Sequence, residues 1–282
     1  MSEERFESEF DPTEVARDVE GRFARRIVMN VPDRHNPKLH RLLELVNLDD
    51  DLYALWTAAN VNAVERLGMT DHGPVHVKIV MNMAVRMLRL LADAGIHGGV
   101  VENYRMDGID AEVVVALASM LHDVGMSIHR HDHETYSLFI AQRKLEELLP
   151  PIYSRREATI IRAEVLHAII SHRSGGRPLT VEAGVVRIAD ALDMAKGRSR
   201  IPFSSGSLSI HSVSAAAVES VSINRGTVKP IGVTVALSNS AGLFQLDQLL
   251  RNKLDGSGLE EHVEIDVRVG AEEKRILTDF SF

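Results

Sequence analysis

The residues of this chain most suited to chemistry are the adjoining His122 and Asp123, at the end of an apolar segment that Gly125 closes. Imidazole nitrogens and carboxylate oxygens suit ions such as Mn, Fe, Co, Ni and Zn. Neighbours in sequence can both reach one cation only if the backbone between them is fixed, and an apolar helix that ends in glycine fixes it. The pair therefore indicates a metal site, provided that other segments supply further ligands.

Further candidate ligands lie on both sides of this pair, each on its own segment with helical spacing. Most of the 13 histidines fall between residues 72 and 172, which a scattered surface distribution would not produce. Two choices are open from the residues alone, because His129 and His131 compete with His133, and His167 competes with His172. The candidates are His72, His76, His133, His172 and Asp190.

Composition narrows the class of protein. The chain has 282 residues, 45% hydrophobic and 26% charged, which is typical of a globular protein with one large or two ordinary domains. We expect no membrane span and no targeting peptide, because no apolar run is long enough and the N-terminus is polar and acidic. The lack of cysteine leaves N and O ligands for a metal, and the predicted location is cytoplasmic. A net charge of −8 without a long basic run gives no strong general signal for nucleic-acid binding.

The apolar spacing predicts helices first and strands only after about residue 207. Asp110 is the expected N-cap of a buried helix that ends at Asp123. An earlier helix is expected from Thr13 to about Met29, within an acidic N-terminal segment at 1–35. The other predicted helices span 37–68, 75–94, 131–148, 155–171 and 180–194, the last with Thr180 as its cap.

Beyond residue 208 the pattern changes to strands, at 218–223, 228–237, 263–269 and 275–280, with an amphipathic helix at 242–254. The last two strands are expected to form a hairpin. The chain is therefore predicted to divide into an all-α domain at 36–208 and a small α+β domain at 209–282. The small domain offers no titratable cluster. The sequence allows three roles for it and does not choose among them: covering the site, sensing a ligand or forming a homo-oligomer.

His76, His122, Asp123 and Asp190 together resemble the signature of the HD-domain superfamily of metal-dependent phosphohydrolases. The resemblance covers about residues 70–200 and implies a mainly α fold, in which an HD-domain helical bundle holds a divalent metal and hydrolyses phosphomonoesters, phosphodiesters or nucleotides. The sequence around His172 and Asp190 is similar to the two-metal subfamilies, which include cyclic-dinucleotide phosphodiesterases and some ribonucleases.

The resemblance implies roles for the candidate residues. His133 and His172 look like the additional ligands of members with two metals, and Asp123 could bridge two ions while taking part in catalysis. His72 precedes His76 as in members that cleave cyclic nucleotides, where the first histidine protonates the leaving oxygen, so His72 is a candidate catalytic acid. The expected cofactors are one or two divalent ions, from Mn, Fe, Co, Ni, Zn or Mg, which would generate a metal-activated hydroxide.

Basic residues close to the ligands in sequence could contact a phosphate group. Arg173, Lys196 and Arg198 are the candidates, because basic side chains bind phosphate and guanidinium groups do so bidentately; a solvated turn is the alternative. Asp193, three residues after Asp190, is expected to support a ligand or cap a helix rather than bind metal.

Two departures from family patterns limit the assignment of a substrate. Met126 stands where many members carry a lysine in contact with phosphate, and no Gly-Tyr-Pro follows His172, which argues against the cyclic-di-GMP branch. The sequence predicts a phosphohydrolase for a small-molecule phosphate ester, most simply a phosphodiester or nucleotide. The alternatives are a regulatory or ligand-sensing HD protein without turnover, and a di-iron oxygenase on an HD-like scaffold.

Overall fold

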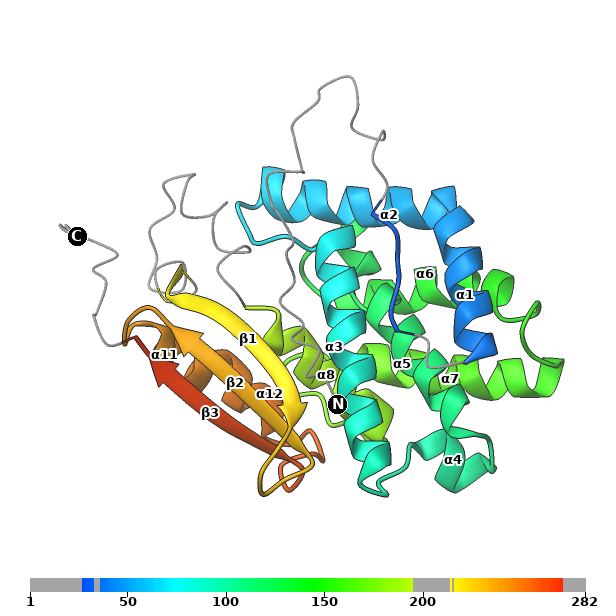
Figure 1. Cartoon of the computed structure of the whole chain (residues 1–282). Coiled ribbons are helices and arrows are strands. Elements are labelled where there is room, and N and C mark those ends of the chain that lie inside the picture. Colours follow the sequence, from blue (N-terminus) through cyan, green and yellow to red (C-terminus); the bar gives the residue numbers. More distant parts are fainter. Residues whose placement is uncertain (1–26, 33–35, 195–213, 215, 271–282) are drawn as a thin grey trace.

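The computed structural model describes residues 27–32, 36–194, 214 and 216–270, and it shows a helical bundle with a small three-stranded sheet beside it (Figure 1). The fold class predicted from the sequence is therefore confirmed. The described helices of the bundle are α1 (Pro37–Leu48), α2 (Asp50–Asn60) with a π-helical turn at Val61–Arg66, α3 (Pro74–Asp93), α4 (Gly99–Tyr104), α5 (Gly108–Leu121), α6 (His133–Leu148), α7 (Arg155–Ser171) and α8 (Val181–Leu192).

Helix α5 lies at the centre of the bundle because its sequence is apolar on every face. Almost all of its side chains from Ala111 to Leu121 are buried. A helix without a polar face has no side to turn toward water, so other helices must surround it. Helices α1, α3, α4, α7 and α8 pack against it (Figure 1). The end of α5 at Leu121 therefore delivers His122 and Asp123 to the interior of the protein.

The N-terminus of α5 differs from the expectation. The helix begins at Gly108 with Asp107 as its N-cap, and Asp110 lies inside the first turn, where its carboxylate accepts the backbone N–H of Asp107 at 3.0 Å. Asp110 also accepts from Lys38 at 2.7 Å and from the Tyr153 hydroxyl at 2.9 Å. The prediction of Asp110 as the cap was wrong because the helix extends one turn further than its apolar residues indicate.

Helix α4 was not predicted from the sequence. Its N-terminus is capped from a distance, because the buried Glu182 carboxylate accepts the N–H groups of Gly99 and Val100 at 2.7 and 3.1 Å. A Cβ on Gly98 would lie 2.4 Å from a Glu182 oxygen, so the glycine permits this approach. The cap comes from α8, which no local pattern could show.

The remaining boundaries mostly follow the sequence pattern. The long segment predicted at 37–68 is divided at Asp49, whose side chain accepts from Leu52 and caps α2, while Thr180 caps α8 as expected. The helix expected at 13–29 lies outside the described residues except for 27–29, which are not helical. The strand expected at 275–280 and the domain boundary near 208 also lie outside them, so both stay predictions.

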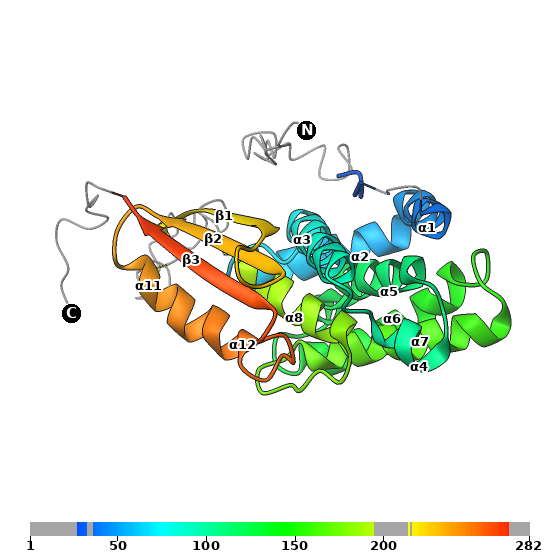
Figure 2. The ribbon, with the colours of Figure 1, turned by 60° about the horizontal axis from the view of Figure 1, so that its bottom comes forward.

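The C-terminal part has strands β1 (Val218–Arg225), β2 (Ile231–Leu237) and β3 (Val263–Val269) in the order β1-β2-β3. β1 pairs antiparallel with β2, and β2 pairs parallel with β3, because the chain crosses between them through a helical segment. That segment runs from α11 (Gly242–Gln245) through a π-helical turn to α12 (Asn252–Leu254) and lies along one face of the sheet (Figure 2).

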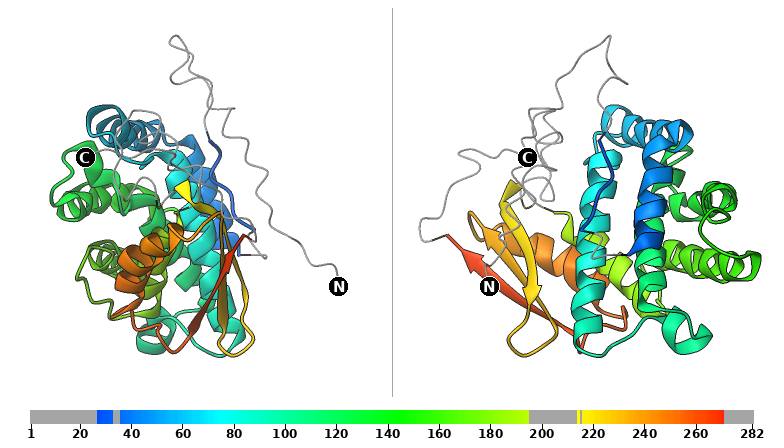
Figure 3. Two further views of the ribbon diagram at one scale, coloured as in Figure 1. Left: turned by 90° about the vertical axis from the view of Figure 1, so that its left-hand side faces the viewer. Right: turned by 45° about the vertical axis from the view of Figure 1, so that its right-hand side comes forward.

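The C-terminal part sits against two helices of the bundle: β1 and β2 contact α3, while α12 and the π-helical turn before it contact α8 (Figure 3). Arg86 of α3 donates to the carbonyl oxygen of Ile223 and, at 2.8 Å, to the side chain of Asn224, both on β1. The C-terminal strands are thus tied directly to the helix that carries His76.

The turn between β1 and β2 is held by a carboxylate from β3. Glu264 accepts the backbone N–H groups of Thr227, Val228 and Lys229 at 2.5, 3.0 and 3.0 Å. These bonds, the one from Thr227 first, lower the pKa of Glu264 from 4.5 to about 2. The charged form of Glu264 is therefore the one that stabilises this turn.

Replacing Glu264 by Gln should make the stability of the protein less dependent on acid. Because the folded pKa of about 2 lies below the ordinary 4.5, the stabilisation is present above pH 4.5 and lost as the pH falls toward 2. Denaturant unfolding of Glu264→Gln should show a stability deficit at neutral pH that shrinks over that range. The exposed Glu261→Gln is the control, and a deficit that does not change with pH would contradict this origin.

Candidate metal centre

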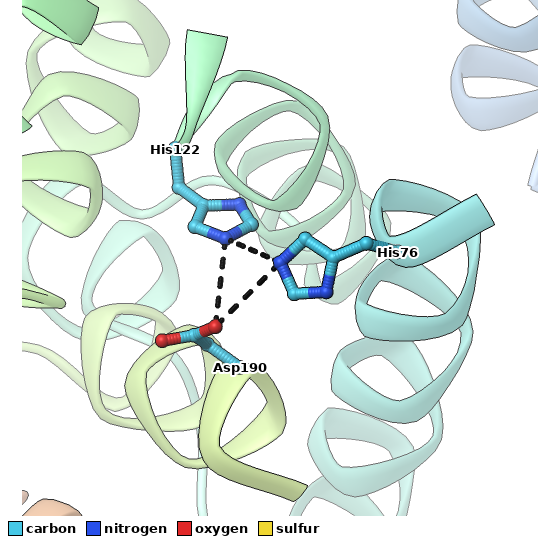
Figure 4. A group of neighbouring side chains, drawn as sticks. All are labelled: His76, His122 and Asp190. Atoms are coloured by element: carbon cyan, nitrogen blue, oxygen red, sulfur yellow. Dashed lines mark hydrogen bonds and ion pairs between the residues drawn. The ribbon is translucent and has the colours of Figure 1, made fainter. Parts of the chain in front are cut away.

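Five helices bring the candidate ligands to one place. His76 lies in the first turn of α3, His122 and Asp123 follow α5, His133 begins α6, His172 ends α7 and Asp190 lies in the last turn of α8. The four histidines and Asp123 are buried. Figure 4 shows His76, His122 and Asp190 pointing toward one another from three separate helices.

The two oxygens of Asp123 face different histidines. Oδ2 lies 3.4 Å from the Nε2 atoms of both His76 and His122. Oδ1 lies 3.1 Å from His133 Nε2 and 3.5 Å from His172 Nε2. We call the first group, together with Asp190, the first pocket, and the His133 and His172 group the second pocket. Asp123 is common to both.

Asp190 completes the first pocket from the opposite side. Its Oδ1 lies 3.6 Å from His76 Nε2 and 3.7 Å from His122 Nε2, the arrangement marked by dashed lines in Figure 4. These atoms all lie within 4.8 Å of one another, and so do ligand atoms of His122, Asp123 and His172. Both sets are close enough for a shared ion.

The orientation of each imidazole is fixed through Nδ1. Nδ1 of His76 lies 2.6 Å from the Asp193 carboxylate. Each of the other three rings places Nδ1 near the carbonyl oxygen three residues earlier, at 2.8, 3.0 and 2.5 Å for His122 to Ser119, His133 to Arg130 and His172 to Ile169. We assign the proton to Nδ1 in all four rings, which leaves the Nε2 lone pairs directed at the pockets.

Two further groups close to His133 Nδ1 bear on the position of its proton. The Arg130 guanidinium lies 2.9 Å from its Nδ1, while the Glu134 carboxylate lies 3.3 Å from the same atom. Nδ1 cannot donate to the carbonyl and accept from the guanidinium at once. The Arg130 carbonyl oxygen and the Glu134 carboxylate are both acceptors, and the second is charged, so together they favour a proton on Nδ1. Glu134 also groups with His133 and His172 as a set that could hold an ion, a role the sequence analysis did not give it.

The distance between two ring nitrogens tests whether these residues fit a cation. With Nδ1 protonated in both rings, the Nε2 lone pairs of His76 and His122 face each other at 3.2 Å. Two acceptors at this distance repel unless a proton or a metal ion lies between them. Burial alone would lower the pKa of His122, but Asp123 and Asp190 raise it to about 10, which favours a proton between the two rings when no metal is bound. A divalent ion would displace it.

The carboxylates stay charged in this buried place. Burial alone would raise the pKa of Asp123 and Asp190, but the neighbouring groups hold both well below the ordinary range. For Asp123 the compensation comes from His122, His133 and His172, and for Asp190 from Lys253 first and then His122. Burial lowers the pKa of His172, which favours its neutral form. Neutral imidazole and ionised carboxylate are the forms that bind metal.

The structure separates the competing histidines. His129 and His131 are exposed, and His131 pairs with Asp132 at 2.8 Å. His167 accepts the backbone N–H of Leu179 at 3.0 Å through Nε2. The structure thus brings His133 and His172 to Asp123 and directs these three rings elsewhere.

His72 lies at the solvent side of the first pocket. Its Nδ1 is 2.7 Å from the carbonyl oxygen of Thr70, and its Nε2 is 3.9 Å from Asp123 Oδ2. The His72 side chain is 13% exposed and that of Asp190 is 20% exposed, whereas the His76 and His122 side chains are fully buried. A substrate would therefore reach the cluster past His72 and Asp190.

Of the three predicted substrate-binding residues, the structure describes Arg173. Arg173 is exposed, and the described contacts of this residue involve its carbonyl oxygen rather than its guanidinium. Lys196 and Arg198 lie outside the described residues. A cation that was not predicted from the sequence does reach the cluster: Lys253 of α12, whose Nζ lies 3.2 Å from Asp190 Oδ2. Nothing near Lys253 in sequence indicates a site, so only the fold reveals it.

The turn after His122 and Asp123 is packed tightly against the start of α6. Gly125 donates its N–H to Ser137 Oγ at 2.8 Å, and Ser137 donates to the His122 carbonyl oxygen at 2.6 Å. A Cβ on Gly125 would lie 2.0 Å from the His133 carbonyl oxygen and 2.5 Å from the Ser137 nitrogen. Glycine at this position therefore allows His133 to approach Asp123.

A family model described as HD domain matches residues 75–195, a range that contains the ligand candidates of both pockets. The chain is also 44% identical over 214 residues to "Uncharacterized protein MJ1020" of Methanocaldococcus jannaschii. These aligned residues make up 76% of this chain and 83% of that relative. This chain belongs to the HD-domain family.

Membership of the HD-domain family confirms the resemblance read from His76, His122, Asp123 and Asp190. It implies a metal-dependent hydrolase, and HD domains bind divalent metals. Within the part of the HD protein that the structure describes, no helix has both the length and the apolar character needed to cross a membrane.

Replacing Gly125 by Ala should damage the turn that follows His122 and Asp123. Because the new methyl group would overlap backbone atoms, we expect a loss of about 1–3 kcal/mol or more in the free energy of unfolding and weaker metal binding. Gly108→Ala is the matched control, since no atom lies within 4 Å of a Cβ there; it should be neutral or stabilising by about 0.5–1 kcal/mol. Urea unfolding and metal content measure both effects. Equal behaviour of the two variants would contradict the packing argument.

Proposed function

We propose that this HD-domain protein is a phosphohydrolase that uses one or two divalent ions to hydrolyse a phosphate ester, either a phosphodiester or a nucleotide. The observation that supports this most is the placement of Asp123, whose two oxygens each face a separate set of imidazole nitrogens. A carboxylate that faces two ligand sets is suited to bridge two ions. The family supplies the reaction class, and the geometry supports a centre for two ions.

The residues divide between the two pockets. His76, His122, Asp190 and Asp123 Oδ2 would hold one ion, and His133, His172 and Asp123 Oδ1 the other. When bound, such ions lower the pKa of water and offset negative charge on a phosphoryl group in the transition state.

The side chains of this protein supply orientation and a proton. Asp193 accepts from His76 Nδ1 and thereby keeps the Nε2 lone pair of His76 directed into the first pocket. The Thr70 carbonyl does the same for His72, whose Nε2 points toward Asp123 at the exposed side of the cluster. When both ring nitrogens of His72 carry a proton, the one at Nε2 can be donated to the leaving oxygen of an ester that enters from solvent.

The metal centre can be tested by binding and turnover together. The wild-type protein should bind Mn²⁺ and hydrolyse bis-p-nitrophenyl phosphate or p-nitrophenyl phosphate with at least one of Mn, Co, Ni and Mg. His122→Ala and Asp123→Ala should lose both properties, because each removes a buried ligand. His131→Ala, with its side chain 83% exposed, is the matched control and should retain both. Metal binding without turnover of any ester would favour a regulatory protein instead, and full turnover by Asp123→Ala would refute the site.

The role of His72 can be tested with leaving groups of different basicity. His72→Gln should slow hydrolysis of an alkyl phosphodiester by about 10²–10⁴-fold, because its leaving oxygen needs a proton. The loss should be much smaller for a p-nitrophenyl ester, whose leaving group departs as a stable anion. Mn²⁺ binding should be close to that of the wild type. Equal losses for both esters would mean that His72 does not act as the acid.

A further inference from the structure

A lysine from the C-terminal part of the chain reaches the cluster. Lys253 of α12 places Nζ 3.2 Å from Asp190 Oδ2 and also donates to the carbonyl oxygen of His172. Asp190 belongs to the first pocket and His172 to the second. One ammonium group thus contacts a residue of each pocket, although it is 63 residues from Asp190 in the sequence.

The position of Lys253 is held by a buried arginine. On one side the Arg187 guanidinium donates to the carbonyl oxygens of Lys253 and Asn252, at 2.8 and 3.1 Å. On the other side it donates to those of Ser171 and Arg173, at 3.2 and 2.5 Å. Arg187 therefore ties α12 to the end of α7, on both sides of His172. Figure 2 shows α12 beside α8, the helix that carries Arg187 and Asp190.

The contact with Lys253 divides the Asp190 carboxylate between two partners. Its Oδ1 faces His76 and His122, while its Oδ2 faces Lys253. The Asp190 side chain is 20% exposed, so without a partner on Oδ2 it could turn toward water. Lys253 is 18% exposed and lies at the same open side. The ion pair thus keeps Oδ1 directed at the ring nitrogens of the first pocket.

We propose that Lys253 is a positioning residue of the metal centre, through which the segment of β1–β3 and α11–α12 completes the site. Lys253 fixes the Asp190 carboxylate and the backbone of His172 in the arrangement that receives the ions. The C-terminal part is then necessary for metal binding and not only a neighbour of the HD domain. This inference rests on the metal centre proposed above.

If Lys253 acted only through its charge, its removal would change the affinity for metal in the opposite direction from that expected if Lys253 positions the ligands. An ammonium group beside a cation repels it, so loss of the positive charge alone should make metal binding tighter. Loss of an outer partner of a ligand weakens metal binding, by about 10–100-fold in known sites. The sign of the change therefore decides whether Lys253 positions the ligands.

The experiment uses the full chain, with Mn²⁺ as the probe and calorimetry as the measurement. We expect Lys253→Met to bind Mn²⁺ about 10–100-fold more weakly than the wild type, Lys253→Gln to be intermediate, and Lys253→Arg to be close to the wild type. Arg251→Met is the matched control, because Arg251 is exposed and pairs only with Asp247 among the described ion pairs. It should bind Mn²⁺ as the wild type does.

Thermal unfolding with a chelator present shows whether each variant is folded. If Lys253→Met is not folded, Mn²⁺ binding by Lys253→Gln is compared with that of the wild type instead. Unchanged or tighter Mn²⁺ binding by folded Lys253→Met or Lys253→Gln would overturn the inference while leaving the metal centre intact. Failure of the wild-type protein to bind any divalent ion would overturn the proposed function and this inference together.

Discussion

The buried Asp123 carboxylate is the constraint on which the rest of the site depends. An isolated charge in a protein interior is so unfavourable that it must be paired or bind a metal. Here four imidazole nitrogens surround its two oxygens at 3.1–3.5 Å. Each of these rings must be held in one orientation, which is why five helices end or begin at this point of the bundle.

The same hydrogen bonds that orient the rings also complete the helix ends. The last carbonyl groups of a helix have no partner within the helix. His122 and His172 follow α5 and α7 directly, and their Nδ1 atoms bond the carbonyl oxygens of Ser119 and Ile169 in the last turns. The negative ends of the α5 and α7 dipoles therefore face the pockets, which favours a cation there, whereas α3 and α6 begin at the site and direct their positive ends toward it. The same two hydrogen bonds thus pair carbonyl groups at the helix ends and orient two ligands of the metal centre.

The sequence predicts most of what is local and little of what depends on distant contacts. The helix predicted at 155–171 matches α7 because its apolar spacing and its capping residues all lie within or next to this segment of the sequence. The start of α4 could not be predicted, since its cap, Glu182, comes from another helix. The ligand candidates could be chosen because residue types and spacing suffice to suggest them. The place of Lys253 depends on how α12 packs, which no pattern near it encodes.

The position of Met126 supplies no cation to the pockets. Many proteins that resemble this one carry a lysine at that position, but here Met126 is fully buried against Ala59 and Ala63. The described part of the chain instead offers Lys253, which enters from the C-terminal side and pairs with Asp190. The crossover segment between β2 and β3 thus carries a positive charge next to the first pocket that position 126 does not supply.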